Sequence, residues 1–285
     1  MTHNTGNNPL RCNDHCLPFY LDCDYIFSNV VVTPAREGGT RVQWSLGSSI
    51  RDEGPYLYSL QVGNAGVDDP HAWTTVVTEI DVCCLIDPQR RLTGVQSFTH
   101  YRLKLETAEG IYYSRPLHTF GKLHYMDWRM YESILRAEGI RLASREGTSG
   151  TLLKRKISGI KCFRCRDFGT GEVKDAMCKL CYGTGWLGGY YAPIHCFFIN
   201  LQPSGSTITK DVNMQGPVAE THYTGRAIAV PILTSGDVWI NRESSERWVI
   251  TELKHLVEVK GIPKVYQIGL DRIPFSDVVY SLSVE

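Results

Sequence analysis

The chain has 285 residues, of which 30 are Lys or Arg and 30 are Asp or Glu, and 42% are hydrophobic. A chain of this length buries on the order of three quarters of its unfolded surface and usually forms two or three domains. The balanced charge argues against a protein whose main task is to coat a phosphate backbone, and the hydrophobic content argues against intrinsic disorder.

The sequence contains no signal for membrane insertion or export. The longest apolar runs, such as Ala227–Leu233, are far shorter than the roughly 18–20 residues that span a bilayer, so we expect no membrane partner. The N-terminus lacks a basic region followed by an apolar stretch, so we expect no secretory signal. If the chain is not exported, as we expect, its ten cysteines indicate metal ligands or free thiols before structural disulfides.

The first 121 residues are predicted to form an N-terminal arm followed by a β domain. Residues 1–19 are polar and rich in Asn and are predicted to form an N-terminal arm. Residues 20–121 contain short stretches rich in Val, Tyr, Thr and Trp between turn residues, which is typical of an all-β sandwich. The predicted strands are Val30–Thr33, Arg41–Leu46, Tyr56–Val62, Trp73–Ile80, Tyr101–Thr107 and Ile111–Ser114.

Several positions in this domain share the pattern of one known family. A Pro beside the first strand (Pro34), a Trp in the second (Trp44) and a Tyr-x-Leu-x-Leu strand from Tyr101 that leads into Gly110 together resemble a fibronectin type III domain. The resemblance implies an immunoglobulin-like sandwich over about a third of the chain. Such domains usually present or space other modules, so the resemblance implies no chemistry of its own.

Residues 122–150 are predicted to form a helical linker. Asp127 is the candidate N-cap of a helix that places Trp128 and Tyr131 on one face, and Gly139 is expected to end or bend it. A stretch of Gly, Ser and Thr then leads into a cysteine-rich segment.

The cysteine-rich segment, residues 151–193, is the strongest signal in the chain. Cys162 and Cys165 form one Cys-x-x-Cys pair, and Cys178 and Cys181 form a second pair twelve residues later. Two such turns supply four thiolates in a tetrahedron, which is the geometry that Zn²⁺ prefers in closed structural sites. We therefore predict a zinc ribbon with these four ligands and structural Zn²⁺ as the cofactor, with no catalytic and no cofactor-binding residues besides them.

The second cysteine pair belongs to a longer run, Cys178–Gly185, that is similar to the CxxCxGxG unit of the zinc domain in DnaJ-type chaperones. Those domains have four units, and the His-Pro-Asp motif of the J-domain is absent here, so the resemblance implies the zinc clamp alone. Thiol exchange is the rival interpretation of Cys-x-x-Cys pairs. In the simplest interpretation, the segment of about thirty residues is too short to form a hydrophobic core of its own, and the metal ion stabilises it instead.

A basic stretch overlaps this segment. Residues 136–166 contain nine Lys or Arg and two Asp or Glu, although the whole chain is neutral. The stretch supports an alternative function, a zinc-ribbon adaptor that binds nucleic acid or acts like a chaperone, with contacts from Lys154, Arg155 and Lys156. A partner-facing basic patch explains the same charges equally well.

The other cysteines carry no clear motif. Cys83, Cys84 and Cys196 lie in apolar stretches and are expected to behave as small hydrophobic residues. Although His195 precedes Cys196, adjacent strand residues point to opposite faces, so the two do not form a nucleophile and base. No catalytic motif is present, and we predict that the chain is not an enzyme. Free thiols are predicted in the N-terminal arm and just after it, at Cys12, Cys16 and Cys23; the alternative is a second metal site that includes His15, for which the spacing is poor.

Residues 194–285 are predicted to form a β-barrel-like domain, so the whole fold is expected to be mainly β. The block from Leu152 to Pro193 resembles segments of phage structural proteins. The last hundred residues resemble the small barrels of head–tail connector proteins, with a Gly-Asp-hydrophobic strand at Gly236–Val238 and a short hairpin. The predicted strands here are Asp237–Ile240, Arg247–Ile250, Val265–Leu270 and a terminal strand at Val278–Val284.

These resemblances imply a structural protein of a tailed-phage virion, assembled in the host cytoplasm. A neck or head–tail connector role implies a ring of identical copies that contacts a portal or adaptor protein on one side and a tail terminator or collar protein on the other. The alternative within the same class is a tail or baseplate protein. Nucleic acid is expected as a secondary partner only.

Overall fold

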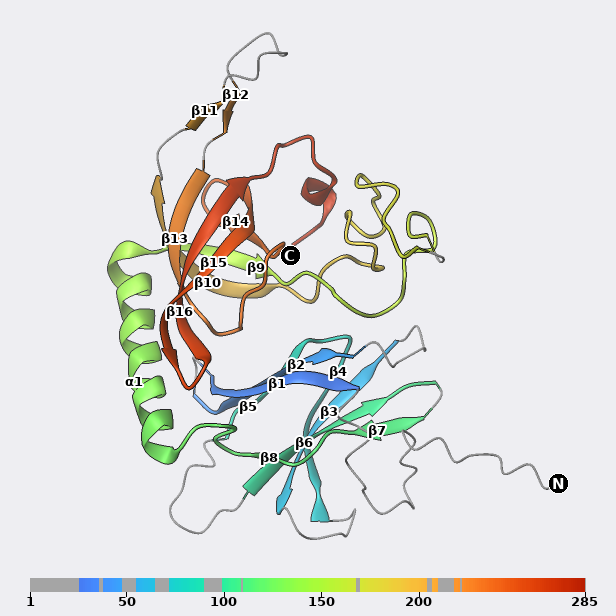
Figure 1. Cartoon of the computed structure of the whole chain (residues 1–285), viewed down its shortest axis with the longest axis vertical. Coiled ribbons are helices and arrows are strands. Elements are labelled where there is room, and N and C mark those ends of the chain that lie inside the picture. Colours follow the sequence, from blue (N-terminus) through green and yellow to red (C-terminus); the bar gives the residue numbers. More distant parts are fainter. Residues whose placement is uncertain are drawn as a thin grey trace, which may run out of the picture. The chain divides into compact units, whose positions relative to one another are not determined.

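The computed structural model describes residues 26–35, 38–47, 55–64, 72–89, 99–108, 110–167, 170–203, 207–209, 218–220 and 222–284. The described residues are mainly β, as the sequence predicts, and contain one α-helix (Figure 1). They divide into two compact units, one within residues 1–128 and 158–160 and the other within residues 129–157 and 161–285.

The first unit contains two antiparallel sheets. One sheet has the order β1-β2-β5 and consists of β1 (Phe27–Pro34), β2 (Thr40–Leu46) and β5 (Cys84–Asp87). The other has the order β4-β3-β6-β7, with β8 also paired to β6. Its strands are β3 (Leu57–Asn64), β4 (Thr74–Ile80), β6 (Thr99–Glu106), β7 (Ile111–Tyr113) and β8 (Leu117–His118). Each of the six strands predicted in this region overlaps one of these.

Buried side chains join the two sheets. The ring of Trp44 in β2 lies 4.9 Å from that of Tyr58 in β3, and Tyr101 in β6 donates a hydrogen bond of 2.9 Å to Asp87 in β5. All four of these side chains are buried. Two packed antiparallel sheets are what an immunoglobulin-like sandwich requires. The narrower assignment to fibronectin type III domains stays a prediction.

Helix α1 (Tyr125–Arg141) buries the predicted face, which includes Trp128 and Tyr131. The prediction that Asp127 is the N-cap is wrong. The helix starts two residues earlier, and the Asp127 carboxylate instead accepts a hydrogen bond of 3.3 Å from the backbone N–H of His124. This is the reciprocal half of a capping box, in which an acidic residue in the first turn reaches back to the N-cap.

Gly139 does not end α1, contrary to one of the two expectations for this residue. The helix continues to Arg141 and then into a π-helical turn, Leu142–Glu146. Ion pairs hold this last part of the helix: Glu138 pairs with Arg141 at 3.1 Å and with Arg226 of the second unit's sheet at 2.7 Å. Such contacts partly offset the roughly 1 kcal/mol by which glycine weakens a helix interior.

The second unit is built on a closed barrel with the strand order β10-β13-β16-β15-β14-β9. Its interior is filled with large apolar side chains, among them Leu152, Phe197, Trp239, Tyr266 and Ile268. The barrel strands are β9 (Thr148–Leu153), β10 (Ile194–Pro203), β13 (His222–Ile228), β14 (Val238–Asn241), β15 (Arg247–Val259) and β16 (Ile262–Arg272). Between β10 and β13 the chain forms a small ribbon of β11 (Thr207–Thr209) and β12 (Val218–Glu220).

Strand β9 spans the boundary at residue 150 between the predicted helical linker and the predicted zinc ribbon. It pairs with β10 on one side and with β14 on the other. The barrel is therefore completed by a strand that precedes the predicted barrel domain, residues 194–285, in the sequence. The cysteine-rich residues 154–193 are therefore an insertion between two neighbouring strands of the barrel. We call these residues the insertion.

Gly150 makes the closure of the barrel through β9 possible. A Cβ atom built at this position would lie 2.3 Å from Nε1 of Trp239 and 2.4 Å from the carbonyl oxygen of Ile240. We expect Gly150→Ala to lower the free energy of unfolding of the barrel by about 1–3 kcal/mol, because the added carbon overpacks the core. Urea unfolding checks this, with the neighbouring Ser149→Ala as control; equal stability of the two variants would contradict the packing argument.

The C-terminal residues do not form the predicted strand at Val278–Val284. Val278–Ser281 is a 3₁₀ turn, because the Asp277 side chain accepts a hydrogen bond of 2.8 Å from the backbone N–H of Val279. The buried Arg247 guanidinium donates to the carbonyl oxygens of Val279 and Leu282 and holds this turn against the barrel.

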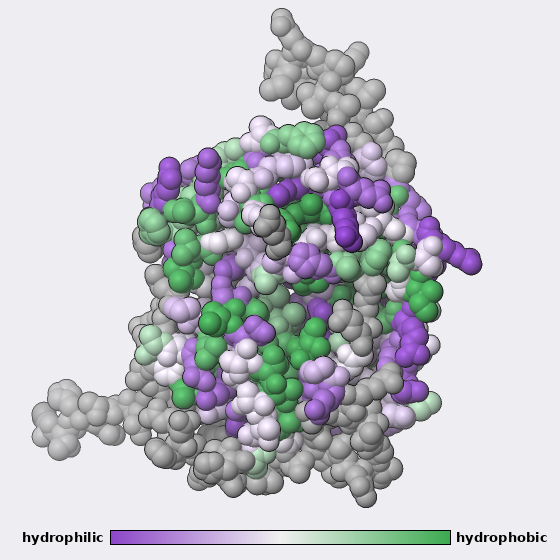
Figure 2. Space-filling model, turned by 180° about the vertical axis from the view of Figure 1, so that it is seen from behind, coloured by the Kyte–Doolittle hydropathy of each residue, from purple (hydrophilic) through white to green (hydrophobic). Residues whose placement is uncertain are grey.

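Large apolar side chains also remain on the surface. Figure 2 shows hydrophobic side chains among hydrophilic ones on one face of the molecule. None of the helices in the described part of the chain combines the length and apolar composition needed to cross a membrane. The most exposed large apolar residues include Ile80, Met126, Ile140, Phe163 and Phe275.

Candidate metal centre

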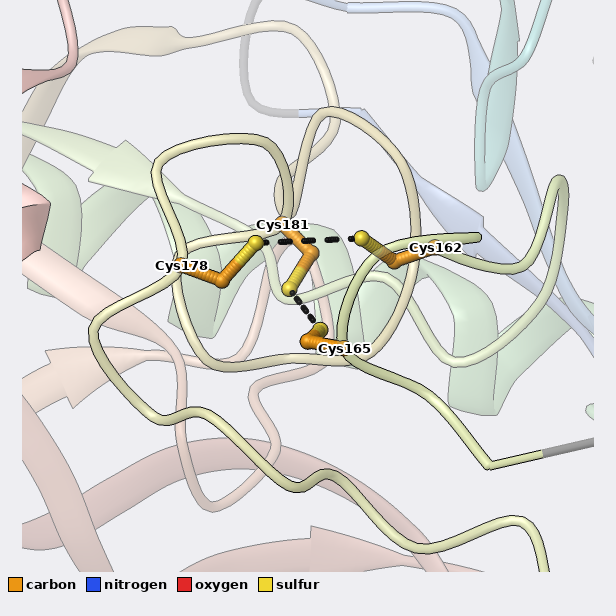
Figure 3. Close-up of side chains that lie close together, drawn as sticks. All are labelled: Cys162, Cys165, Cys178 and Cys181. Atoms are coloured by element: carbon orange, nitrogen blue, oxygen red, sulfur yellow. Dashed lines mark hydrogen bonds between the residues drawn. The ribbon is translucent and has the colours of Figure 1, made fainter.

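The insertion brings all four predicted ligands together. Cys162, Cys165, Cys178 and Cys181 are buried, and their sulfur atoms lie within 4.8 Å of one another and point toward a common centre (Figure 3). They are the only described group of Cys, His, Asp or Glu residues that is arranged to hold a metal ion. This part of the prediction is confirmed: the four residues can bind an ion.

The sulfur–sulfur distances can be compared with a tetrahedral site. Four metal–sulfur bonds of about 2.3 Å place neighbouring sulfurs about 3.8 Å apart. The sulfurs of Cys162 and Cys178 are 3.8 Å apart, whereas those of Cys165 and Cys181 are only 3.0 Å apart. The distance between Cys162 and Cys178 therefore fits a tetrahedral site, whereas the sulfurs of Cys165 and Cys181 are closer together than such a site requires.

Backbone groups prepare one of the thiols to become a thiolate. Burial alone would raise the pKa of Cys178, but the backbone N–H groups of Leu180 and Cys181 donate hydrogen bonds to its sulfur and lower the pKa to about 7. These donors come from the tight turn between the two cysteines of the pair. The turn closes with a hydrogen bond of 2.8 Å from the Tyr182 N–H to the Cys178 carbonyl oxygen.

The opposite shift dominates at two other ligands. Burial raises the pKa of Cys165, as do its contacts with the neighbouring thiols. Burial also raises the pKa of Cys181, although hydrogen bonds from Cys165 and from the Gly185 backbone oppose the shift. Because metal ligands must be deprotonated, ion binding displaces protons here, and the affinity for metal falls as the pH falls.

A glycine allows the chain to turn after the second cysteine pair. Gly183 has φ of +73°, which side chains disfavour, and a Cβ atom there would lie 2.8 Å from the carbonyl oxygen of Ala176. The next residue, Thr184, then donates its N–H and its hydroxyl to the carbonyl oxygen of Cys181. The glycine spacing seen in the sequence thus wraps the backbone around the ligands.

A buried ion pair fixes the start of the insertion to the barrel. Lys154 Nζ lies 2.6 Å from Asp237 Oδ2, and both side chains are almost fully buried. The other ammonium protons are donated to Ile232 O and Thr234 Oγ1, at 2.9 and 3.0 Å. Asp237 also accepts hydrogen bonds from the backbone N–H groups of Arg155 and Thr234. Every polar group of the pair is therefore satisfied, as a buried charge requires.

Two tyrosines of the insertion dock on the outside of the barrel. Tyr182, which follows the fourth cysteine, and Tyr190 pack against an apolar cluster that includes Val238 of β14 and Val279 of the C-terminal turn. At the base of the insertion, Arg155 forms a β-bridge with Tyr190. The burial of Tyr190 raises its pKa to about 12. The metal centre therefore shares its supporting contacts with the last residues of the chain.

The remaining sequence-predicted positions play no part in the centre. Cys83 and Cys84 are half-buried. The expectation that Cys196 is a small hydrophobic residue of an apolar strand is wrong, because a β-bulge with φ of +56° at this residue leaves it exposed. His195 contacts Thr151, 3.3 Å away. The expected free thiols lie outside the described residues: Cys12, Cys16 and Cys23.

The structure divides the basic stretch 136–166 into buried and exposed charges. Lys154, which the sequence analysis proposes as a nucleic-acid contact, is buried in its ion pair and cannot reach a ligand. Arg141 pairs with Glu138 and Glu146. Sequence reasoning did not find Asp237 as the partner of Lys154, because a single Asp before a strand carries no signal of its own.

Comparison of the chain with family models and with curated proteins finds no match to either. The centre is therefore defined by its own geometry, as a buried four-cysteine site that can hold a metal ion.

Proposed function

We propose that this chain is a non-enzymatic structural component of a tailed-phage virion, a neck or head–tail connector protein that forms a ring of identical copies between portal and tail. The observation that carries the proposal is the closed barrel with a filled interior. A part that sets the spacing between its neighbours must be rigid, and a closed, close-packed barrel provides that rigidity.

The barrel also contains two of the three elements that the connector resemblance implies. The Gly-Asp-hydrophobic run leads into β14, and a short hairpin connects β14 to β15. The third element, a terminal strand, is replaced by the 3₁₀ turn at Val278–Ser281. The support therefore comes from the barrel and its hairpin.

An open strand edge provides a place for contacts between copies. Strand β14 pairs with β9 on one side and, on the other, with β15 only over Arg247–Val249. From Glu252 onward, β15 pairs only with β16 among the described strands. The outer edge of β15 therefore has backbone groups available for a strand of another chain, and such edges commonly mediate association.

We further propose that the ion in the four-cysteine centre is Zn²⁺ with a structural role. Four thiolates in a closed, buried arrangement are the donor set of structural zinc sites. The ion clamps an insertion whose only described apolar cluster, apart from the tyrosines on the barrel, is the cysteines with Leu180. Zinc therefore provides the stability that a hydrophobic core would otherwise supply.

Electron microscopy tests the proposed function. We expect the purified full-length chain to form closed rings in negative stain, and an antibody against it to label native virions between capsid and tail. Labelling of the tail tip would favour a tail or baseplate role instead. A chain that stays monomeric at all concentrations and labels no particle would refute the proposal.

A further inference from the structure

The two turns that hold the metal ligands present exposed side chains at their outer ends. Phe163 and Arg164 lie between the ligands of the first pair, and the Phe163 side chain is 69% exposed. Lys179 lies between the ligands of the second pair and is exposed as well. Within the described part of the chain, neither Arg164 nor Lys179 forms an ion pair.

These side chains cannot withdraw from the surface. The backbone on either side of Phe163 and Arg164 is fixed because Cys162 and Cys165 turn into the metal centre. The two turns therefore expose one large apolar ring and two cations that form no ion pair among the described residues, which suits a partner that offers both an apolar face and negative charge.

A second aromatic group with a cation lies on the same insertion. The guanidinium of Arg166 lies over the ring of Trp186, 4.1 Å from its centroid. Lys161 forms a backbone β-bridge with Trp186, which brings the start and the end of the cysteine-rich loop together. The insertion therefore repeats the combination of an aromatic ring and a positive charge.

The insertion is also the basic part of a neutral protein. Residues 154–193 contain eight Lys or Arg and three Asp or Glu, whereas the rest of the chain contains 22 and 27. Lys154 pairs with Asp237, and Lys174 pairs with Asp167 at 2.7 Å. The excess that remains is positive, which is complementary to a polyanion.

We propose that the insertion binds single-stranded nucleic acid, with the Phe163 ring stacking on a base and with Arg164 and Lys179 contacting phosphates. Single strands are favoured over duplexes because a phenyl ring can stack on a base only where that base is not already stacked in a helix. Single-stranded DNA and RNA offer the same chemistry. The proposal goes beyond the structural role above and does not depend on ring formation.

Fluorescence anisotropy with the metal-loaded full-length chain tests the proposal. The probes are labelled 20-nucleotide oligo-dT and oligo-U, a 20-base-pair duplex and poly-glutamate of similar charge, each at 50 and 200 mM salt. We expect at least one of the two single strands to bind more tightly than the duplex and poly-glutamate, and to bind less tightly at the higher salt concentration. If only one of oligo-dT and oligo-U binds tightly, the result assigns the site to single-stranded DNA or to RNA, respectively.

Two variants separate stacking from charge. Phe163→Ala is expected to weaken binding about 5-fold to 100-fold without changing the salt dependence. Arg164→Gln with Lys179→Gln is expected to weaken binding and to reduce the slope of log affinity against log salt by roughly 1.4, about 0.7 for each lost phosphate contact. The matched control is Arg242→Gln with Lys254→Gln, two exposed cations of the barrel.

Each other result overturns the proposal. Absence of binding at 50 mM salt, or equal binding of poly-glutamate, would show that the insertion does not recognise nucleic acid. An equal loss in the control pair would show that general charge attraction is responsible. Metal content and circular dichroism are measured on every variant, so that a loss of binding is interpreted only where the insertion keeps its ion.

Discussion

Replacing Cys178 by serine is expected to remove the metal ion and to loosen the insertion while the rest of the chain stays folded. Backbone N–H groups of Leu180 and Cys181 lower the pKa of Cys178 to about 7, so its loss removes a thiol that the backbone prepares for ionisation. Structural zinc sites contribute on the order of 10 kcal/mol or more to local folding, which the small cysteine cluster of the insertion cannot replace.

The measurement combines elemental analysis with hydrogen exchange. We expect bound metal to fall at least about tenfold, exchange to accelerate across residues 154–193, and the two sheets of the first unit to remain protected. The C-terminal turn should also exchange faster, because Tyr182 packs in the same cluster as Val279. Cys196→Ser, which removes an exposed thiol outside the centre, is the control. Unchanged metal content in Cys178→Ser would show that the ligand assignment is wrong.

Removing the charge of Asp237 is expected to destabilise the barrel strongly. In Asp237→Asn the Lys154 ammonium stays buried with only neutral acceptors, Ile232 O and Thr234 Oγ1. Leaving one partner of a buried ion pair uncompensated costs about 3–5 kcal/mol. Lys154→Met is expected to cost less, because the Asp237 carboxylate keeps its hydrogen bonds from Thr234 and from the Arg155 backbone.

Urea unfolding, with hydrogen exchange at β9 and β14 to identify the unit that unfolds, measures both variants. The double variant Lys154→Met with Asp237→Asn should be more stable than Asp237→Asn alone, because no unpaired charge remains. Glu258→Gln, which breaks an exposed contact with His255, is the control and should change stability by less than about 1 kcal/mol. If Asp237→Asn also lowered the free energy of unfolding by less than about 1 kcal/mol, the conclusion that the buried Lys154–Asp237 ion pair stabilises the barrel would be contradicted.

The sequence predicted the clustering of the four cysteines because the information for it is local. All four ligands lie in two short turns, and the spacing within each turn determines where the sulfurs point. The strands of the first unit were predicted for a similar reason. Alternation in segments such as Arg41–Leu46 specifies both the strand and its buried face.

The parts that the sequence did not predict depend on distant contacts. Strand β9 contains Gly and Ser, which locally indicate a linker, and Gly150 is explained only by the Trp239 ring that lies against it. Lys154 and Asp237 are 83 residues apart, and nothing near either residue indicates a buried pair. The Val-Val-Tyr run near the C-terminus favours a strand, yet Asp277 and Arg247 stabilise a turn there.

The position of the insertion has a consequence for folding. Neighbouring strands β9 and β10 are separated in sequence by the whole insertion, whose base is joined by the Arg155–Tyr190 bridge. Once the ion is bound, the forty residues between the strands behave as a short connection, which lowers the entropic cost of pairing them by about 2 kcal/mol. We therefore expect β9 and β10 to pair faster during folding when metal is present than when it is withheld.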